Sequence, residues 1–177
     1  LKLFQISCNI LTIKKINKKI NLQSFARDNR YKLIINQSLT KKIDMILTAH
    51  HKDDLIENFF IRLLRGSGLK GLISFSKIKS KVKFDDKIFI LRPLIDITKK
   101  DLAYISKNTF NFNVNDPSNL DDKFLRVKVR KLISNLEKDG LTFNKFKLSL
   151  NNLSKSNNAI EYYVQRNINY NSNYSKL

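Results

Sequence analysis

The spacing of apolar positions predicts alternating strands and helices along the first half of the chain. Ile10–Ile13 and Met45–Thr48 are short apolar runs, which predict strands. Met45–Thr48 lacks alternation, as expected for a strand buried on both faces of a parallel sheet. After Asn21, a suitable N-cap, apolar residues recur three, four or seven positions apart as far as Ile34, which indicates one helix face. The succession of strands and helices is typical of βαβ units.

A second amphipathic helix is predicted from about Lys52. Apolar pairs repeat every four residues between Leu55 and Leu64 and make a wide stripe, which we expect to pack on the sheet. Gly66 follows directly and is placed to end the helix as a C-cap.

A hairpin and three further helices are predicted for the rest of the chain. Residues 77–91 favour two strands around a turn at Asp85–Asp86, and Pro93 ends the second strand. Thr98, with Asp101 three residues later, predicts the start of a helix that reaches about residue 108. Helices are also expected at residues 124–136 and from residue 141 onward.

Together these patterns predict an α/β fold, with a parallel sheet and flanking helices, followed by a mainly helical C-terminal extension. We place a catalytic domain at residues 1–135 and the helical extension at residues 136–177. The extension ends in an Asn-rich tail, which we expect to be frayed and mobile.

The charge balance points to a polyanionic partner. The chain has 34 Lys plus Arg against 15 Asp plus Glu, a formal net charge of +19, which favours salt-dependent binding to nucleic acid. Abundant Lys, Asn and Ile, as an AT-rich genome would produce, account for part of this excess. The single Cys8 excludes an internal disulfide framework and a multi-cysteine metal site. No apolar run is long enough to span a membrane.

Candidate catalytic side chains are most closely grouped where the second predicted strand is followed by a helix. His50 and His51 are followed by three carboxylates, those of Asp53, Asp54 and Glu57. Carboxylates in a first turn can simply complement the helix dipole. Spacings of three and four, however, place two of them on one helix face, which suits Mg²⁺ or a cationic amine. A zinc site is disfavoured, because the two histidines are adjacent and point opposite ways when they leave a strand.

Three other segments each have a structural interpretation, and two of them also have a functional one. Arg65–Gly68 is either an anion-binding loop with exposed backbone N–H groups or a helix end followed by a turn. Asp116–Asn119 is an ordinary turn sequence. Arg126 and Arg130, four residues apart on one helix face, are either surface charges or a clamp for phosphate or carboxylate.

Taken in order, these segments resemble the tRNA(Ile)-lysidine synthetases, a family within the N-type PP-loop ATPases. The resemblance covers residues 22 to about 130 and is most specific where a His-His-x-Asp-Asp element joins an Arg-Gly-Ser-Gly-Leu-Lys-Gly-Leu element. The matching stretches are Leu22–Tyr31, Thr48–Asn58, Arg62–Leu72, Arg92–Leu94 and Asp116–Asn119, with Phe124, Arg126 and Arg130.

The resemblance implies an adenine nucleotide alpha hydrolase-like fold and a two-step, ATP-dependent and Mg²⁺-dependent reaction. ATP adenylates the C2 oxygen of the wobble cytidine in a tRNA(Ile) with a CAU anticodon, and the amine of free L-lysine then displaces AMP. The resemblance implies no membrane partner, and it leaves open whether the protein is a monomer or a homodimer. The compartment is expected to be the cytoplasm, with a plastid or mitochondrion as alternative.

The resemblance also implies roles for individual residues. Asp54 and Glu57 would hold the lysine ammonium, and Arg126 the lysine carboxylate or a phosphate. The expected catalytic residues are His51, Asp53, Asp54, Glu57 and Arg126. The expected ATP contacts are Arg27, Arg30 and Thr48, and the expected Mg²⁺ ligands are Asp53 and Asp54. The expected substrate and tRNA contacts are Arg65, Gly66, Ser67, Gly68, Lys70, Arg92, Asp116, Ser118, Asn119 and Arg130.

The sequence departs from the family pattern in several places. The Ser-Gly-Gly-x-Asp-Ser loop that cradles the ATP pyrophosphate is not found in these 177 residues, so we expect the chain to be N-terminally incomplete and inactive alone. A degenerate homologue without catalysis is the other interpretation. Leu55, Asn58 and Val127 replace the usual Gln, Thr and Asn. Two alternative functions stay open: a PP-loop tRNA thiolation enzyme, which a single Cys8 disfavours, and a non-catalytic basic RNA-binding module.

Overall fold

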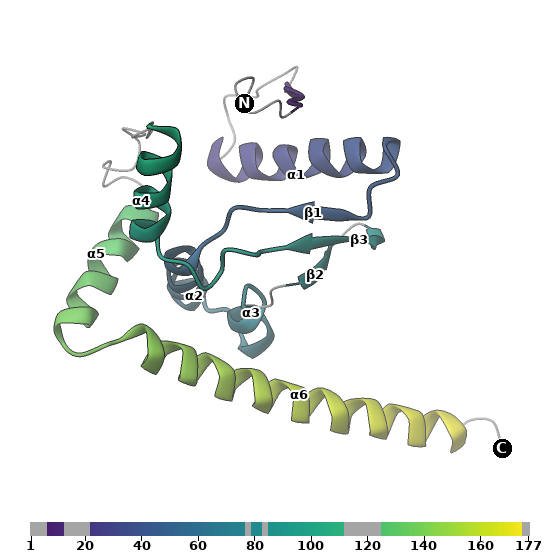
Figure 1. Ribbon diagram of the computed structural model, residues 1–177. Coiled ribbons are helices and arrows are strands. Elements are labelled where there is room, and N and C mark those ends of the chain that lie inside the picture. Colours follow the sequence, from purple (N-terminus) through teal and green to yellow (C-terminus); the bar gives the residue numbers. More distant parts are fainter. Residues whose placement is uncertain (1–6, 13–21, 77–78, 83–84, 112–124, 175–177) are drawn as a thin grey trace. The chain divides into compact units, whose positions relative to one another are not determined.

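The computed structural model describes residues 7–12, 22–76, 79–82, 85–111 and 125–174, which fall into two compact units (Figure 1). One unit contains Leu1–Leu47 and Lys79–Leu91, and the other contains Thr48–Ile78 and Arg92–Leu177. The chain therefore leaves the first unit after residue 47 and returns to it for one hairpin. The domain boundary near residue 135 stays a prediction.

In its described residues, the first unit consists of a small sheet and one helix. Helix α1 (Leu22–Thr40) precedes the strands β1 (Met45–Leu47), β2 (Lys79–Val82) and β3 (Asp85–Leu91). The strand order is β1-β3-β2, with β1 parallel and β2 antiparallel to β3. The parallel pair joins strands far apart in sequence, as expected of an α/β fold, and the antiparallel pair is the predicted hairpin.

Helix α1 covers one face of this sheet, as Figure 1 shows. The core consists of Ile35 from α1 with Ile46, Ile88 and Ile90 from the strands. Successive side chains of a strand point to opposite faces, and within β1 only Ile46 is buried. Its two neighbours in β1 are 39% and 65% exposed, so the prediction of burial on both faces of this strand was wrong.

Two other local predictions in this unit were wrong. Ile10–Thr12 form no regular secondary structure and are exposed, although β-branched residues there predict a strand. Asp85 and Asp86 belong to β3, where Asp85 pairs with Val82, so they are strand residues and not the predicted turn. Propensity is a weak guide where pairing with another segment decides the structure.

The second unit is helical in its described residues. Its helices are α2 (Lys52–Leu64), α3 (Leu69–Ile73), α4 (Lys99–Phe110), α5 (Leu125–Lys138) and α6 (Phe143–Tyr174). All four of the predicted helices in this region are therefore found, with α3 as an additional short one. The Asn-rich segment, predicted to fray, is helical as far as Tyr174.

The apolar stripe of α2 packs against other helices. Leu55 and Ile56 lie in one buried cluster with Ile73, Val129 and Phe146, which come from α3, α5 and α6. The predicted packing of this stripe on the sheet stays a prediction, since the sheet belongs to the other unit. Periodicity identifies the buried face of a helix but not its partner. No helix in the described part of the chain has the length and apolar character needed to cross a membrane.

Candidate functional site

The first turn of α2 is stabilised by its own side chains. His51 is the N-cap residue, and its backbone N–H donates to the Asp54 carboxylate over 3.0 Å. This is the reciprocal half of a capping box, which satisfies an N–H that the helix leaves unpaired. The His51 Nε2 atom also lies 3.4 Å from Asp54 Oδ2. A predicted catalytic pair thus has a local structural role as well.

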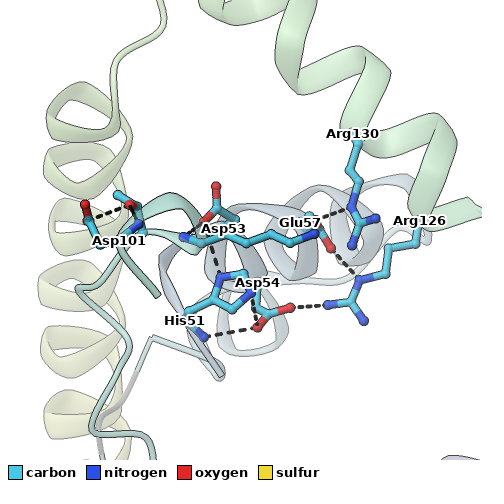
Figure 2. Close-up of polar contacts among 9 residues, drawn as sticks. His51, Asp53, Asp54, Glu57, Asp101, Arg126 and Arg130 are labelled. Carbon is cyan, nitrogen blue, oxygen red and sulfur yellow. Dashed lines mark hydrogen bonds and ion pairs between the residues drawn. The ribbon is translucent and has the colours of Figure 1, made fainter. Parts of the chain in front are cut away.

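Two arginines of α5 approach the carboxylates of α2, as Figure 2 shows. The Arg126 guanidinium donates through Nε to Glu57 and through Nη2 to Asp54. The Arg130 guanidinium donates through Nε to the other oxygen of Glu57. The structure therefore brings together four of the residues that the sequence predicted for the site. Two carboxylates three residues apart on α2 therefore face two guanidiniums four residues apart on α5.

Burial makes the pairing of Glu57 energetically necessary. Glu57 is only 4% exposed, and a buried carboxylate that loses its partner typically costs about 3–5 kcal/mol. The side chains of Arg126 and Arg130 are 48% and 34% exposed, so both guanidiniums also reach solvent. This arrangement holds two cations at the surface in a defined geometry, where they can meet an anionic group.

Asp53 is paired differently from its two neighbours. Its Oδ2 atom accepts a 2.8 Å hydrogen bond from the backbone N–H of Lys99 and lies 3.2 Å from His51 Nδ1. The imidazole of His51 therefore lies between the carboxylates of Asp53 and Asp54 (Figure 2). Carboxylate oxygens suit Mg²⁺ by their chemistry. In the described residues, however, no three His, Cys, Asp or Glu side chains group to hold a metal, and the Mg²⁺ ligands stay a prediction.

The predicted anion-binding loop is built as a helix end. Gly66 has φ +71°, and its N–H donates to the carbonyl of Leu63, while the N–H of Ser67 donates to that of Arg62. This pair of bonds is a Schellman motif, which requires a residue in the left-handed region. The C-cap interpretation is therefore confirmed, and the role of this loop in binding tRNA stays a prediction.

Asn58, one of the departures from the family pattern, has a clear structural role. Its side-chain oxygen accepts a 2.7 Å hydrogen bond from Nε of Arg62, and the Nη1 of Arg62 donates to the carbonyl of Gly71. A Cβ atom at Gly71 would lie 3.0 Å from that of Ser67. Arg62 thus fixes α3 closely against the end of α2, a role that sequence reasoning did not assign.

Two predicted tRNA contacts have partners within the chain. Lys70 of α3 is exposed and lies 3.3 Å from the carboxylate of Glu161 on α6. Arg92 is 7% exposed, and its guanidinium lies over the ring of Phe75 at 4.8 Å. The burial of Arg92 favours a packing role over the predicted contact with tRNA. Asp116, Ser118 and Asn119 lie outside the described residues.

The predicted ATP contacts are divided between the two units. In the sheet unit, Arg27 is exposed and Arg30 lines a hollow of about 340 Å³ whose other walls include Ala26, Leu33 and Ile34. An apolar hollow with one guanidinium suits the base and phosphates of a nucleotide. In the helical unit, the hydroxyl of Thr48 lies 2.8 Å from the Nδ1 of His50.

A second hollow, of about 240 Å³, adjoins the paired carboxylates; we call it the Glu57 pocket. Its lining residues are Asp53, Ile56, Glu57, Lys99, Arg130, Ile133, Ser134 and Glu137. Sequence reasoning missed Lys99, Ser134 and Glu137. Ser134 and Glu137 follow Arg130 by four and seven residues, so the helical repeat of α5 could have indicated them. Lys99 is brought to the pocket only by the tertiary fold.

Comparison with known families fits this arrangement. A family model described as a PP-loop domain matches residues 1–137, more than half of the chain. The chain belongs to the PP-loop domain family. This membership confirms the predicted α/β fold class and implies ATP as the nucleotide.

Relatives of this PP-loop chain carry one common name. A tRNA(Ile)-lysidine synthase of Orientia tsutsugamushi is 43% identical over 129 residues, which are 71% of this chain and 28% of that protein. One of Rickettsia typhi is 38% identical over 146 residues, 82% of this chain and 31% of the relative. One of Bradyrhizobium diazoefficiens is 32% identical over 143 residues, which are 81% of this chain and 38% of that protein. The chain thus spans well under half the length of these relatives.

Proposed function

We propose that the protein containing these 177 residues is a tRNA(Ile)-lysidine synthase. It would ligate lysine to C2 of the wobble cytidine in a tRNA(Ile) with a CAU anticodon. The observation that carries this proposal is the cluster of Asp54, Glu57, Arg126 and Arg130 in a PP-loop chain whose relatives bear that name. A net charge of +19 suits a tRNA substrate.

In the first step, the C2 oxygen of the cytidine attacks the α-phosphorus of ATP, and the bond to pyrophosphate breaks. In the second step, the lysine amine attacks C2, the C2–O bond breaks, and AMP leaves with the oxygen while the amine loses a proton. Negative charge must be stabilised on the phosphate in both steps, and oriented guanidiniums supply such stabilisation. Arg126, half exposed and held by two carboxylates, is the group that we assign to this task.

Lysine is a zwitterion with an additional ammonium, so its site needs carboxylates and cations together. The Glu57 pocket has the carboxylates of Glu57 and Glu137 and the cations of Lys99 and Arg130 in its lining. We assign lysine binding to this pocket. Because Arg126 already pairs with Asp54 and Glu57, an incoming ammonium would compete with its guanidinium for these carboxylates.

The test uses the full gene product that contains this chain, with ATP, labelled lysine and a transcript of tRNA(Ile) bearing CAU. We expect lysine to enter the tRNA with one AMP released for each lysine. A transcript with U in place of the wobble C is the control and should accept no lysine. We expect the reaction in the cytoplasm.

Two results would overturn the proposal. Binding of tRNA without AMP release or lysine incorporation would favour a non-catalytic RNA-binding module. Transfer of sulfur in place of lysine would indicate a thiolation enzyme.

A further inference from the structure

The carboxylate of Asp53 joins the start of α2 to the start of α4. Its Oδ2 atom accepts the backbone N–H of Lys99, 46 residues further along the chain. Lys99 is the first residue of α4, and its N–H is one of the four at a helix start that have no acceptor within the helix. Asp53 therefore acts as a cap for a helix other than its own.

Further hydrogen bonds surround this contact. The N–H of Lys52 donates to the carbonyl of Ile97 over 2.9 Å, so the two helix starts are linked in both directions. Within α4, the hydroxyl oxygen of Thr98 accepts the N–H of Asp101 over 3.1 Å. Thr98 and Asp53 thus satisfy different N–H groups of the same turn. The local cap cannot replace the distant one.

The contact also shapes the Glu57 pocket, because Asp53 and Lys99 both line it. Asp53 lies on α2 beside Glu57, whereas the Lys99 wall belongs to α4. A displacement of the first turn of α4 would therefore move one wall of the pocket and leave the paired carboxylates and arginines in place. Such a displacement would alter how the substrate is held in the pocket, since positioning contacts set the geometry of the bound state.

We propose that Asp53 is a positioning residue, which acts through the N–H of Lys99 to hold the first turn of α4 at the Glu57 pocket. This assigns Asp53 a different role from the catalytic and Mg²⁺-binding one that the resemblance implies. The inference rests on the proposed function for the identity of the substrate in the pocket. The contact between α2 and α4 does not depend on that function.

The test compares Asp53→Asn with Asp53→Ala in the full gene product. The amide oxygen of Asn can accept the Lys99 N–H, whereas Ala offers no acceptor. In Asp53→Ala, hydrogen exchange in the peptide covering residues 97–102 should accelerate about fivefold, the effect of losing one cap. In the ligation assay, the KM of Asp53→Ala for lysine should rise roughly fivefold, while its kcat should stay within about twofold of the parent value. Asp53→Asn should stay within about twofold of the parent in both measurements.

Asp101→Asn is the matched control, since it removes a carboxylate from the same first turn without touching α2. It should leave the KM for lysine unchanged. The proposal is overturned if Asp53→Asn is as impaired as Asp53→Ala, because the charge itself would then be required, as for a metal ligand. It is also overturned if exchange at residues 97–102 does not respond to Asp53→Ala. Accelerated exchange in a protein that makes no lysidine would support the contact and refute the proposed function.

Discussion

The two ends of α2 are both polar, but they are held in different ways. At its C-terminal end, the N–H groups of Gly66 and Ser67 bond to carbonyls three and five residues earlier. At its N-terminal end, Asp54 and Glu57 pair with arginines of α5 that lie 69 to 73 residues away. A helix start needs only local caps and a favourable dipole. The distant arginines therefore exceed what the helix requires, which supports our proposal that the site lies at the N-terminal end.

Removing Glu57 tests this difference most strongly. Glu57→Ala should lower the free energy of unfolding by about 2 kcal/mol, because a buried side chain leaves a cavity and two guanidiniums lose a shared partner. Because both arginines are partly exposed to solvent, the loss of their partner adds little to this cost. Urea unfolding measures the effect. Glu137→Ala, which changes an exposed carboxylate of α5, should alter stability by less than about 0.5 kcal/mol. A similar result for both variants would mean that the ion pairs are not formed.

Arg126→Lys separates chemistry from stability at the same end. An ammonium cannot donate to Asp54 and Glu57 in the forked geometry of a guanidinium. We expect kcat/KM for lysine ligation to fall roughly 100-fold. The free energy of unfolding should fall by no more than about 1 kcal/mol, since Arg130 still pairs with Glu57. The control is Lys128→Met, an exposed cation on the same helix, which should leave the rate unchanged. Equal rates for Arg126→Lys and the parent protein would remove Arg126 from the proposed mechanism.

A pair of glycine variants tests the C-terminal end. Gly66→Ala places a Cβ atom at φ +71°, which should destabilise the protein by about 1–2 kcal/mol, although no atom lies within 4 Å of the new carbon. Gly68→Ala meets no neighbour and has an ordinary φ of −70°, so it should change stability by less than about 0.5 kcal/mol. Thermal unfolding measures both. If both variants instead weakened tRNA binding equally without loss of stability, the loop would be an anion site.

Much of the fold could be predicted because its causes are local. Thr98 with Asp101, Gly66 after Arg65, and the spacing of apolar residues from Leu55 to Leu64 each determine a helix boundary or face within a few residues. The features that could not be predicted concern partners. Apolar character in β1 does not reveal which face a helix covers, and the stripe of α2 does not reveal that it packs on α5 and α6.

The candidate site follows the same division. The sequence by itself determined that Asp54 and Glu57 share a helix face and that Arg126 and Arg130 share another, since a helix places residues three and four apart together. Only the tertiary structure decided that these faces meet, that Glu57 is buried between two guanidiniums, and that Asp53 caps α4 through Lys99. Such pairings depend on how distant helices pack, and packing is set by the combined burial of many side chains rather than by any short motif.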